Sequence, residues 1–159
     1  MERRKILFLC TGNSARSILA ELLLRHLEPV RFEVASAGSN PRGSVNPLAL
    51  EVLQRDYGLD TSSARSKSWT ELDGTDFDVV ITLCDDARET CPIWPGQPIV
   101  AHWGMPDPAA GEGADDEKRK AFRDTARELY RRLDLLRKLP IETLDRLALG
   151  AAVNRLAGA

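Results

Sequence analysis

Short apolar runs alternate along the chain with stretches in which apolar residues recur every three or four positions. The short runs are typical of buried strands, and they occupy residues 5–9, 32–35, 78–83 and 98–103. The periodic stretches indicate helices with one buried face, over residues 17–27, 47–57 and 116–137. Strands that alternate with helices form a parallel sheet covered on both faces. The pattern therefore predicts an α/β fold.

Turn-forming and capping residues set the limits of these elements. Asn46-Pro47 is a helix start signal, and Gly58 ends the same helix. Pro140 ends the long helix. We expect the apolar side chains of the amphipathic segment that follows to pack against the rest of the protein, with an exposed docking helix as the alternative: Ile141, Leu144, Leu147 and Leu149. The tryptophans are interpreted as core or rim residues: Trp69, Trp94 and Trp103.

Composition indicates one soluble globular domain, which we expect to span residues 1–159. Hydrophobic residues make up 43% of the chain and charged residues 29%, a balance that allows a buried core. The formal net charge of -2 gives no reason to expect a nucleic-acid or membrane partner. The apolar run at residues 6–10 is too short for a membrane span or a signal peptide, so we expect a cytoplasmic protein.

One polar loop, Cys10-Thr11-Gly12-Asn13-Ser14-Ala15-Arg16-Ser17, lies between a predicted strand and a predicted helix. Backbone N–H groups of such a loop can converge on a bound oxyanion, and Gly12 and Asn13 can adopt the positive φ that it requires. The Arg16 guanidinium can bind two oxygens of a tetrahedral oxyanion. These donors and the Ser17 hydroxyl would stabilise a Cys10 thiolate. We therefore predict that Cys10 is a nucleophile and that the seven residues after it bind the substrate.

Cys84 and Cys91 follow the third predicted strand. The chain has three cysteines, and an odd count argues against a structural disulfide framework. Three interpretations of the pair remain. A zinc site would need more ligands, and only His26 and His102 could be added. Two buried structural thiols are the second interpretation. The third is a redox relay, in which a thiol attacks a covalent Cys10 adduct and another thiol moves the disulfide outward.

Asp107 stands between Pro106 and Pro108, just after the fourth predicted strand. The two prolines stiffen this loop. A displacement at the central atom of a tetrahedral oxyanion needs an acid to protonate the leaving oxygen, and Asp107 is the candidate, with an ordinary turn aspartate as the alternative. Ligands of open α/β sheets bind at the carboxyl ends of the strands. Asp107, Cys10 and Cys84 should therefore meet at one edge of the sheet.

The loop C-T-G-N-S-A-R-S resembles the CX5R loop of the low-molecular-weight tyrosine phosphatase superfamily, and within it the loop of the arsenate reductases. The resemblance runs from Ile6 to the C-terminal helix and implies a single domain with a four-stranded parallel sheet and flanking helices. Thioredoxin-coupled arsenate reductases carry a T-L-C-x6-C-P arrangement, which this chain matches at Cys84 and Cys91-Pro92. By this match Cys84 is the second thiol of the relay, and Cys91 carries the disulfide outward. The H-W-G-x-x-D-P match supports Asp107 as the acid.

The resemblance also bears on metal binding. Some arsenate reductases bind a potassium ion near the loop, and Asn13, Glu21 and Ser36 match part of that site. The acidic ligand that completes the site is missing here, and Lys67 or Arg65 would bring positive charge instead. We therefore expect no bound metal, and the predicted relay needs no organic cofactor.

These features together predict a thioredoxin-coupled arsenate reductase. Arsenate would bind the loop, with phosphate or sulfate as competing oxyanions, and Cys10 would attack arsenic while Asp107 protonates the departing hydroxide. Cys84 and then Cys91 would pass the disulfide to thioredoxin or a similar thiol reductant.

Two alternative functions share the loop. A phosphatase that acts through a Cys10 phosphoenzyme needs Asp107 but neither Cys84 nor Cys91. Residues 109–111 supply no aromatic wall for a phosphotyrosine ring, which favours a small inorganic substrate. The second alternative is a protein without turnover, either a phosphocarrier or an oxyanion and redox sensor.

Overall fold

Four parallel strands form one sheet in the computed structural model, which describes residues 3–91, 94–111 and 113–158. The strand order is β2-β1-β3-β4, and the strands are β1 (Arg4–Cys10), β2 (Phe32–Gly38), β3 (Val79–Thr82) and β4 (Ile99–His102). The predicted four-stranded parallel sheet is confirmed. Cys10 pairs with Gly38 in the register of β1 and β2, so the predicted nucleophile stands at the carboxyl edge of the sheet.

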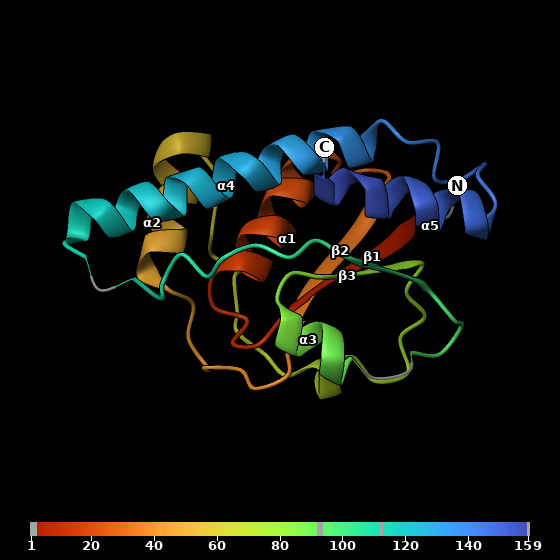
Figure 1. Ribbon diagram of the computed structural model, residues 1–159, viewed down its shortest axis with the longest axis horizontal. Helices are drawn as coiled ribbons and strands as arrows, with labels where there is room; N and C mark the ends of the chain where they lie inside the picture. Colours follow the sequence, from red (N-terminus) through yellow and green to blue (C-terminus); the bar gives the residue numbers. More distant parts are fainter. Residues whose placement is uncertain (1–2, 92–93, 112, 159) are drawn as a thin grey trace.

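Helices lie on both sides of this sheet, as predicted. The longer helices are α1 (Arg16–Leu27), α2 (Pro47–Tyr57), α4 (Asp115–Arg137) and α5 (Arg146–Arg155). Short segments are α3 (Asp85–Thr90) and the 3-10 turns η1 (Trp69–Leu72) and η2 (Leu156–Gly158). Figure 1 shows α1, α4 and α5 along one side of the strands, with α3 on the other side near their carboxyl ends. Pro92, part of the predicted relay motif, lies outside the described residues.

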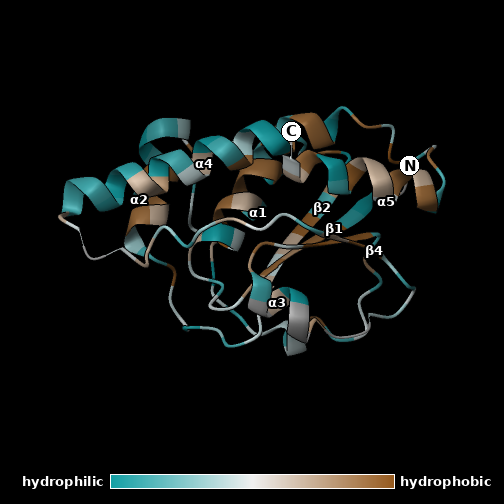
Figure 2. Cartoon of the chain, in the orientation of Figure 1, coloured by the Kyte–Doolittle hydropathy of each residue, from teal (hydrophilic) through white to brown (hydrophobic). Residues whose placement is uncertain are grey.

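The central strands β1 and β3 supply most of the buried core of the sheet. Residues 6–9 and 79–81 have no exposed surface. The predicted apolar face of the long helix is also buried, at Phe122, Ala126, Leu129, Leu133 and Leu136. Figure 2 shows this division, with hydrophobic colour along the strands and hydrophilic colour on the outer face of α4. The hydrophobic pattern of the sequence thus corresponds to the observed core.

The predicted limits of α2 are confirmed by its caps. The Asn46 side chain accepts a hydrogen bond from the N–H of Leu48 at 2.9 Å, and Pro47 occupies the first turn. Gly58 ends the helix in the left-handed conformation, with φ of 65°. The helix therefore begins and ends where its capping residues predict.

One packing prediction at the C-terminal end is wrong. Ile141 and Leu149 are buried and Leu144 is partly buried, but Leu147 is 86% exposed. The reason is that α5 begins only at Arg146, so Ile141 and Leu144 belong to the turns before the helix. The register of α5 then points Leu149 inward and Leu147 outward. The predicted tryptophan positions are confirmed, since Trp94 and Trp103 are buried and Trp69 is partly exposed.

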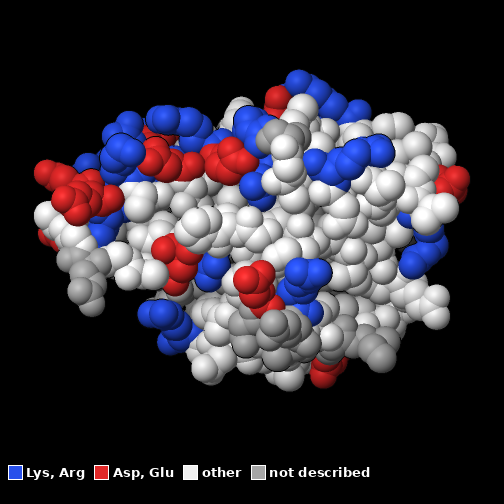
Figure 3. Space-filling view, viewed as in Figure 1, with Lys and Arg blue, Asp and Glu red and all other residues white. Residues whose placement is uncertain are grey.

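Charged side chains of both signs lie together over α2 and α4, as Figure 3 shows. Two ion pairs join these helices, Arg119 to Glu51 and Arg123 to Asp56, each at 3.1 Å. This mixture is typical of a solvated helix face. None of the helices in the described part of the chain combines the length and apolar character needed to cross a membrane.

Trp103 joins the end of β4 to α5, and its replacement should weaken the fold. The indole is fully buried and its Nε1 donates to the carbonyl of Val153 at 2.9 Å. We expect Trp103→Phe to lower the free energy of unfolding by about 1–3 kcal/mol, because it removes a buried hydrogen bond and leaves unfilled space where the larger indole stood. Urea denaturation measures this, with Leu147→Ala as the exposed control within about 0.5 kcal/mol of the parent. Equal effects of the two substitutions would contradict this assignment of the core.

Candidate active site

The chain that follows β2 holds the Cys10 loop from outside. Its backbone N–H groups donate to four loop carbonyls, in the pairs Ser39–Cys10, Asn40–Thr11, Arg42–Gly12 and Asn46–Ser14, at 3.3, 2.9, 3.0 and 2.8 Å. In a trans peptide, the N–H of the next residue points away from the carbonyl. Carbonyls tied outward therefore turn the following N–H groups toward the inside of the loop. That inward set of donors is what an oxyanion requires.

Asn13 fixes the loop from within. Its φ is 45°, in the left-handed region that asparagine tolerates, and its side chain has no exposed surface. The side-chain oxygen accepts from the N–H of Lys67 at 2.9 Å, while Nδ2 donates to Ser17 Oγ and Ser36 Oγ at 2.7 and 2.9 Å. The expectation of positive φ is confirmed for Asn13 and wrong for Gly12, since Asn13 alone has it among the described loop residues.

Gly12 is needed for close approach instead. A Cβ at Gly12 would stand 3.1 Å from Nε and 3.2 Å from Cγ of Arg42. The Gly12 carbonyl also accepts from the Ser66 hydroxyl at 3.1 Å. The absent side chain therefore leaves room for Arg42 against the loop.

The Cys10 thiol is 2% exposed and lies 2.9 Å from Ser17 Oγ. Because Asn13 Nδ2 already donates to Ser17 Oγ, the Ser17 hydroxyl proton is available to Cys10 Sγ. A hydrogen bond from Ser17 favours the thiolate, which is the nucleophilic form. The nucleophile therefore stands with a hydroxyl donor beside its sulfur.

Cys10, Arg16 and Asp107 line one cavity of about 310 Å³, together with loop residues and Arg42. The guanidinium of Arg16 donates to the carbonyl of Met105 at 3.0 Å, which ties the start of α1 to the Asp107 segment. The Asp107 carboxylate accepts from the N–H of Ala109 at 2.9 Å. The structure thus brings the predicted nucleophile, oxyanion ligand and acid together.

Cys84 is outside that cavity's lining but adjacent to the loop. Its Sγ lies 3.2 Å from Thr11 Oγ1 and accepts from the N–H of Ala87 at 3.4 Å, as the N-cap of α3. Cys84 is 9% exposed. Residues 84 and 11 are far apart in sequence, and the second thiol is thus in direct contact with the nucleophile loop.

Cys91 stands at the other end of α3, as its C-cap. The six residues of α3 give a length of about 9 Å at the usual rise per residue, whereas a disulfide needs its Cα atoms within about 7 Å. A Cys84–Cys91 disulfide therefore requires at least partial unwinding of α3. Burial raises the pKa of the Cys91 thiol, and the indole of Trp94 opposes this shift.

His102, which the sequence offered as a possible zinc ligand and as the first residue of the H-W-G-x-x-D-P match, joins the ends of two strands to α3. Its Nδ1 lies 2.8 Å from Thr82 Oγ1, and its Nε2 lies 3.1 Å from the Asp85 carboxylate. A Cβ at Gly104 would stand 2.7 Å from His102 Nε2, so glycine leaves space for the ring. Within the described residues, no three His, Cys, Asp or Glu side chains are grouped as metal ligands.

Glu21 is the centre of a buried charged cluster behind the loop. Its carboxylate accepts from the Ser36 hydroxyl and pairs with Arg25, and Lys67 Nζ lies 3.9 Å away. Burial lowers the pKa of Lys67, and Glu21 opposes this. Of the two cations that the sequence offered for this region, Lys67 is in place and Arg65 pairs with Glu71 at 2.9 Å instead.

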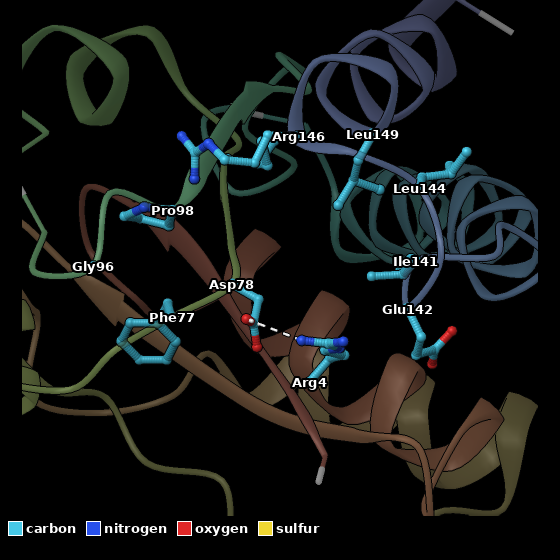
Figure 4. Close-up of a pocket in the computed structure, with 11 residues that line it drawn as sticks. Arg4, Phe77, Asp78, Gly96, Pro98, Ile141, Glu142, Leu144, Arg146 and Leu149 are labelled. Atoms are coloured by element: carbon cyan, nitrogen blue, oxygen red, sulfur yellow. Dashed lines mark ion pairs between the residues drawn. The ribbon is translucent and has the colours of Figure 1, made fainter. Parts of the chain in front are cut away.

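A separate cavity of about 180 Å³ lies at the opposite edge of the sheet. Figure 4 shows Arg4 and Asp78 facing each other inside it, with a distance of 3.8 Å between Arg4 Nη1 and Asp78 Oδ1. Arg146 extends away from that pair. None of the predicted site residues lines this cavity, so the candidate chemistry belongs to the carboxyl edge.

Sequence reasoning missed Arg42, Ser66 and the contacts of His102. Arg42 belongs to the chain after β2, and Ser66 belongs to the chain before η1. Both contact the loop at Gly12, and neither region carries a recognisable motif. For Arg42, the signal was its place shortly after the second predicted strand, because the carboxyl ends of parallel strands share one edge.

A cysteine–arginine oxyanion loop at the carboxyl edge of a four-stranded parallel sheet defines a class of thiol-based enzymes. The chain belongs to the low molecular weight phosphotyrosine protein phosphatase family, whose sequence profile matches residues 5–146.

Named relatives point to one branch of this family. The chain is 38% identical over 133 residues to an arsenate reductase of Halalkalibacterium halodurans, and the match covers 84% of this chain and 94% of that protein. A solved arsenate reductase in the phosphate-binding state has a TM-score of 0.71 at 28% identity, covering 89% and 99% of the two chains. The thioredoxin-dependent arsenate reductase of Corynebacterium glutamicum has a TM-score of 0.57 at 33% identity, covering 84% and 63%.

The end of β2 passes so close to the loop that a side chain at Gly38 should disturb it. A Cβ there would lie 2.4 Å from the Thr11 carbonyl oxygen and 3.0 Å from the Asn13 nitrogen. We expect Gly38→Ala to cost about 1–3 kcal/mol of unfolding free energy, measured in urea, and to weaken the protection of Cys10 from iodoacetamide by phosphate. Gly158→Ala, where a Cβ meets nothing within 4 Å, is the control. Parent-like protection in Gly38→Ala would show that the close approach does not shape the oxyanion site.

The buried environment of Cys91 should delay its ionisation as pH rises. Its raised pKa means that, at a given pH below the midpoint, the native protein has less Cys91 thiolate than the unfolded chain. We expect the pH midpoint of iodoacetamide labelling at Cys91, measured by peptide mass spectrometry, to be higher in the native protein than in urea. A native midpoint equal to or below the unfolded one would refute this.

Proposed function

We propose that this protein reduces arsenate to arsenite, with Cys10 as nucleophile and with Cys84 and Cys91 as a disulfide relay. The oxyanion binds the inward N–H groups of residues 11–17 and the Arg16 guanidinium. Cys10 Sγ attacks arsenic and forms an S–As bond, while Asp107 donates a proton to the departing hydroxide, which leaves as water. The cavity that Cys10, Arg16 and Asp107 share supports this step.

Electrons move to arsenic in the second step. The Cys84 thiolate attacks Cys10 Sγ, the S–As bond breaks, and its electron pair stays on arsenic, so that As(V) becomes As(III) and arsenite leaves. The product on the protein is a Cys10–Cys84 disulfide. Cys91 then attacks Cys84, which restores the Cys10 thiolate and leaves a Cys84–Cys91 disulfide.

The observation that carries this proposal is the 3.2 Å contact between Cys84 Sγ and Thr11 Oγ1. A thiol next to the nucleophile loop is what the reduction of an arsenic adduct needs and what phosphate-ester hydrolysis does not need. The 38% identity to a protein named arsenate reductase supports the same conclusion. Phosphate and sulfate, which share the tetrahedral shape, would compete with arsenate for the loop.

A phosphatase is the second candidate, favoured by the family to which the chain belongs. Cys10 and Asp107 could form and hydrolyse a phosphoenzyme in the same cavity. The described residues that line this cavity include no aromatic ring to hold a phosphotyrosine. A small inorganic oxyanion therefore suits the cavity better than an aryl phosphate.

The electron donor is proposed to be thioredoxin or a similar dithiol protein. The thioredoxin-dependent relative from Corynebacterium glutamicum supports this choice. The relay works only where a reductant regenerates Cys84 and Cys91, so we place the protein in the cytoplasm. No organic cofactor or metal enters the proposed steps.

Turnover assays of the thiols test this function. Arsenate reduction is followed through NADPH oxidation with thioredoxin and thioredoxin reductase, in the parent, Cys84→Ser and Cys91→Ser. We expect both variants to lose turnover by roughly a hundredfold or more, because serine forms no disulfide. Asp107→Asn should lower turnover by about 10²- to 10⁴-fold through loss of the acid.

Each serine variant carries an internal control. Neither Cys84 nor Cys91 lines the cavity, so phosphate should still protect Cys10 from iodoacetamide in both variants as in the parent. Unchanged arsenate turnover in both variants would overturn the relay. Strong hydrolysis of p-nitrophenyl phosphate without arsenate reduction would establish the phosphatase instead.

A further inference from the structure

Arg42 lies at the rim of the oxyanion cavity, on the segment that anchors the loop. It lines the same cavity as Cys10, Arg16 and Asp107. Its own N–H donates to the Gly12 carbonyl at 3.0 Å, which fixes its backbone to the loop. The backbone from which the Arg42 side chain extends is therefore held near the oxyanion site.

The guanidinium arm of Arg42 rests on the Gly12 backbone. The position of a Cβ on Gly12 is only 3.1 Å from Arg42 Nε and 3.4 Å from Arg42 Cδ. Any side chain at residue 12 would compete for that space. Loop and arginine thus fit together because residue 12 is glycine, and Arg42 is one of the residues that line the cavity.

The charge of Arg42 is not used elsewhere in the described structure. Among the residues that the structure describes, no carboxylate lies within ion-pairing distance of Arg42, and its guanidinium donates no hydrogen bond. By contrast, Arg55, an exposed arginine on the neighbouring helix α2, pairs with Glu51 at 2.9 Å. An unpaired guanidinium at the rim of an anion cavity has planar donors available for a second pair of ligand oxygens.

We propose that Arg42 is a second oxyanion-binding arginine, which selects small tetrahedral dianions by adding positive charge opposite the outer oxygens of the ligand. Arg16 holds the inner side of the ligand and Arg42 covers the outer side. An inorganic oxyanion offers charged oxygens there, whereas a phosphate ester would place its organic group toward the rim and lose this contact. Applied to arsenate, the inference rests on the proposed function.

The position of Arg42 predicts which kinetic constant changes when the residue is replaced. Arg42 would contact oxygens that are charged both before and during attack by Cys10, so it binds ground state and transition state alike. Such uniform binding changes KM and leaves kcat largely unchanged. Because the side chain is exposed, the effect should be that of a solvated ion pair, roughly three- to tenfold in affinity.

The test uses inorganic phosphate as the probe and requires no turnover. Cys10 is alkylated with iodoacetamide at increasing phosphate, and the concentration that halves the rate is measured for the parent, Arg42→Gln, Arg42→Lys and Arg55→Gln. Each variant is compared with its own phosphate-free rate, which removes any effect on thiol reactivity itself. Circular dichroism and urea denaturation establish that the variants fold.

We expect Arg42→Gln to raise the half-protecting phosphate concentration roughly three- to tenfold, with Arg42→Lys between it and the parent. Arg55→Gln, which removes the same charge at a distance from the cavity, should match the parent. In the arsenate assay, Arg42→Gln should raise KM by the same factor with kcat nearly unchanged.

Parent-like phosphate protection in Arg42→Gln would overturn the inference, and so would an equal loss in Arg55→Gln, which would reflect net charge alone. The result is separable from the proposed function. If arsenate is not reduced but Arg42→Gln still weakens phosphate protection, the reductase proposal fails and the role of Arg42 in oxyanion binding stands.

Discussion

The site depends on the outward anchoring of the loop carbonyls by the chain after β2. Four backbone hydrogen bonds fix the peptide planes of the loop, and the planarity of the peptide then orients the donors that face an oxyanion. The β1–β2 register makes this possible, because it brings Gly38 against the loop at a place where a Cβ would strike the Thr11 carbonyl. Asn13 completes the arrangement from inside, because its side chain bonds to the hydroxyls of Ser17 and Ser36 and to the backbone N–H of Lys67. The oxyanion site is therefore preorganised by the backbone before any ligand binds.

The relay half of the site is held quite differently. Helix α3 is only six residues long, and a helix this short has little stability of its own. Its first turn is attached through the contact of Asp85 with His102 and of Cys84 with Thr11. Formation of a disulfide between its two ends requires α3 to unwind, which would disturb the buried Ala87 and the contacts of the first turn. A rigid loop for anion chemistry thus adjoins a short helix that must unwind for thiol exchange.

Local patterns in the sequence were sufficient to predict much of the fold. The strands, the limits of α2 and the buried face of α4 follow from hydrophobic spacing and capping residues, which act over a few positions. The predictions for Leu147 and Gly12 were wrong because each depends on how one element meets another: α5 starts later than the apolar pattern suggests, and Gly12 is shaped by Arg42 from a distant segment. The same limit explains why Arg42 and the contacts of His102 escaped notice. The contacts of both residues arise from the tertiary arrangement of the strand ends, and local patterns in a single sequence do not predict that arrangement.

A single-turnover experiment tests the reductase account most directly. Fully reduced protein is mixed with excess arsenate without thioredoxin, quenched with an alkylating agent, and analysed for arsenite and for disulfide-linked peptides by mass spectrometry. The account predicts arsenite in amounts stoichiometric with protein, a Cys84–Cys91 disulfide and alkylated Cys10. Absence of arsenite, or arsenite formation with Cys84 and Cys91 still reduced, would contradict it.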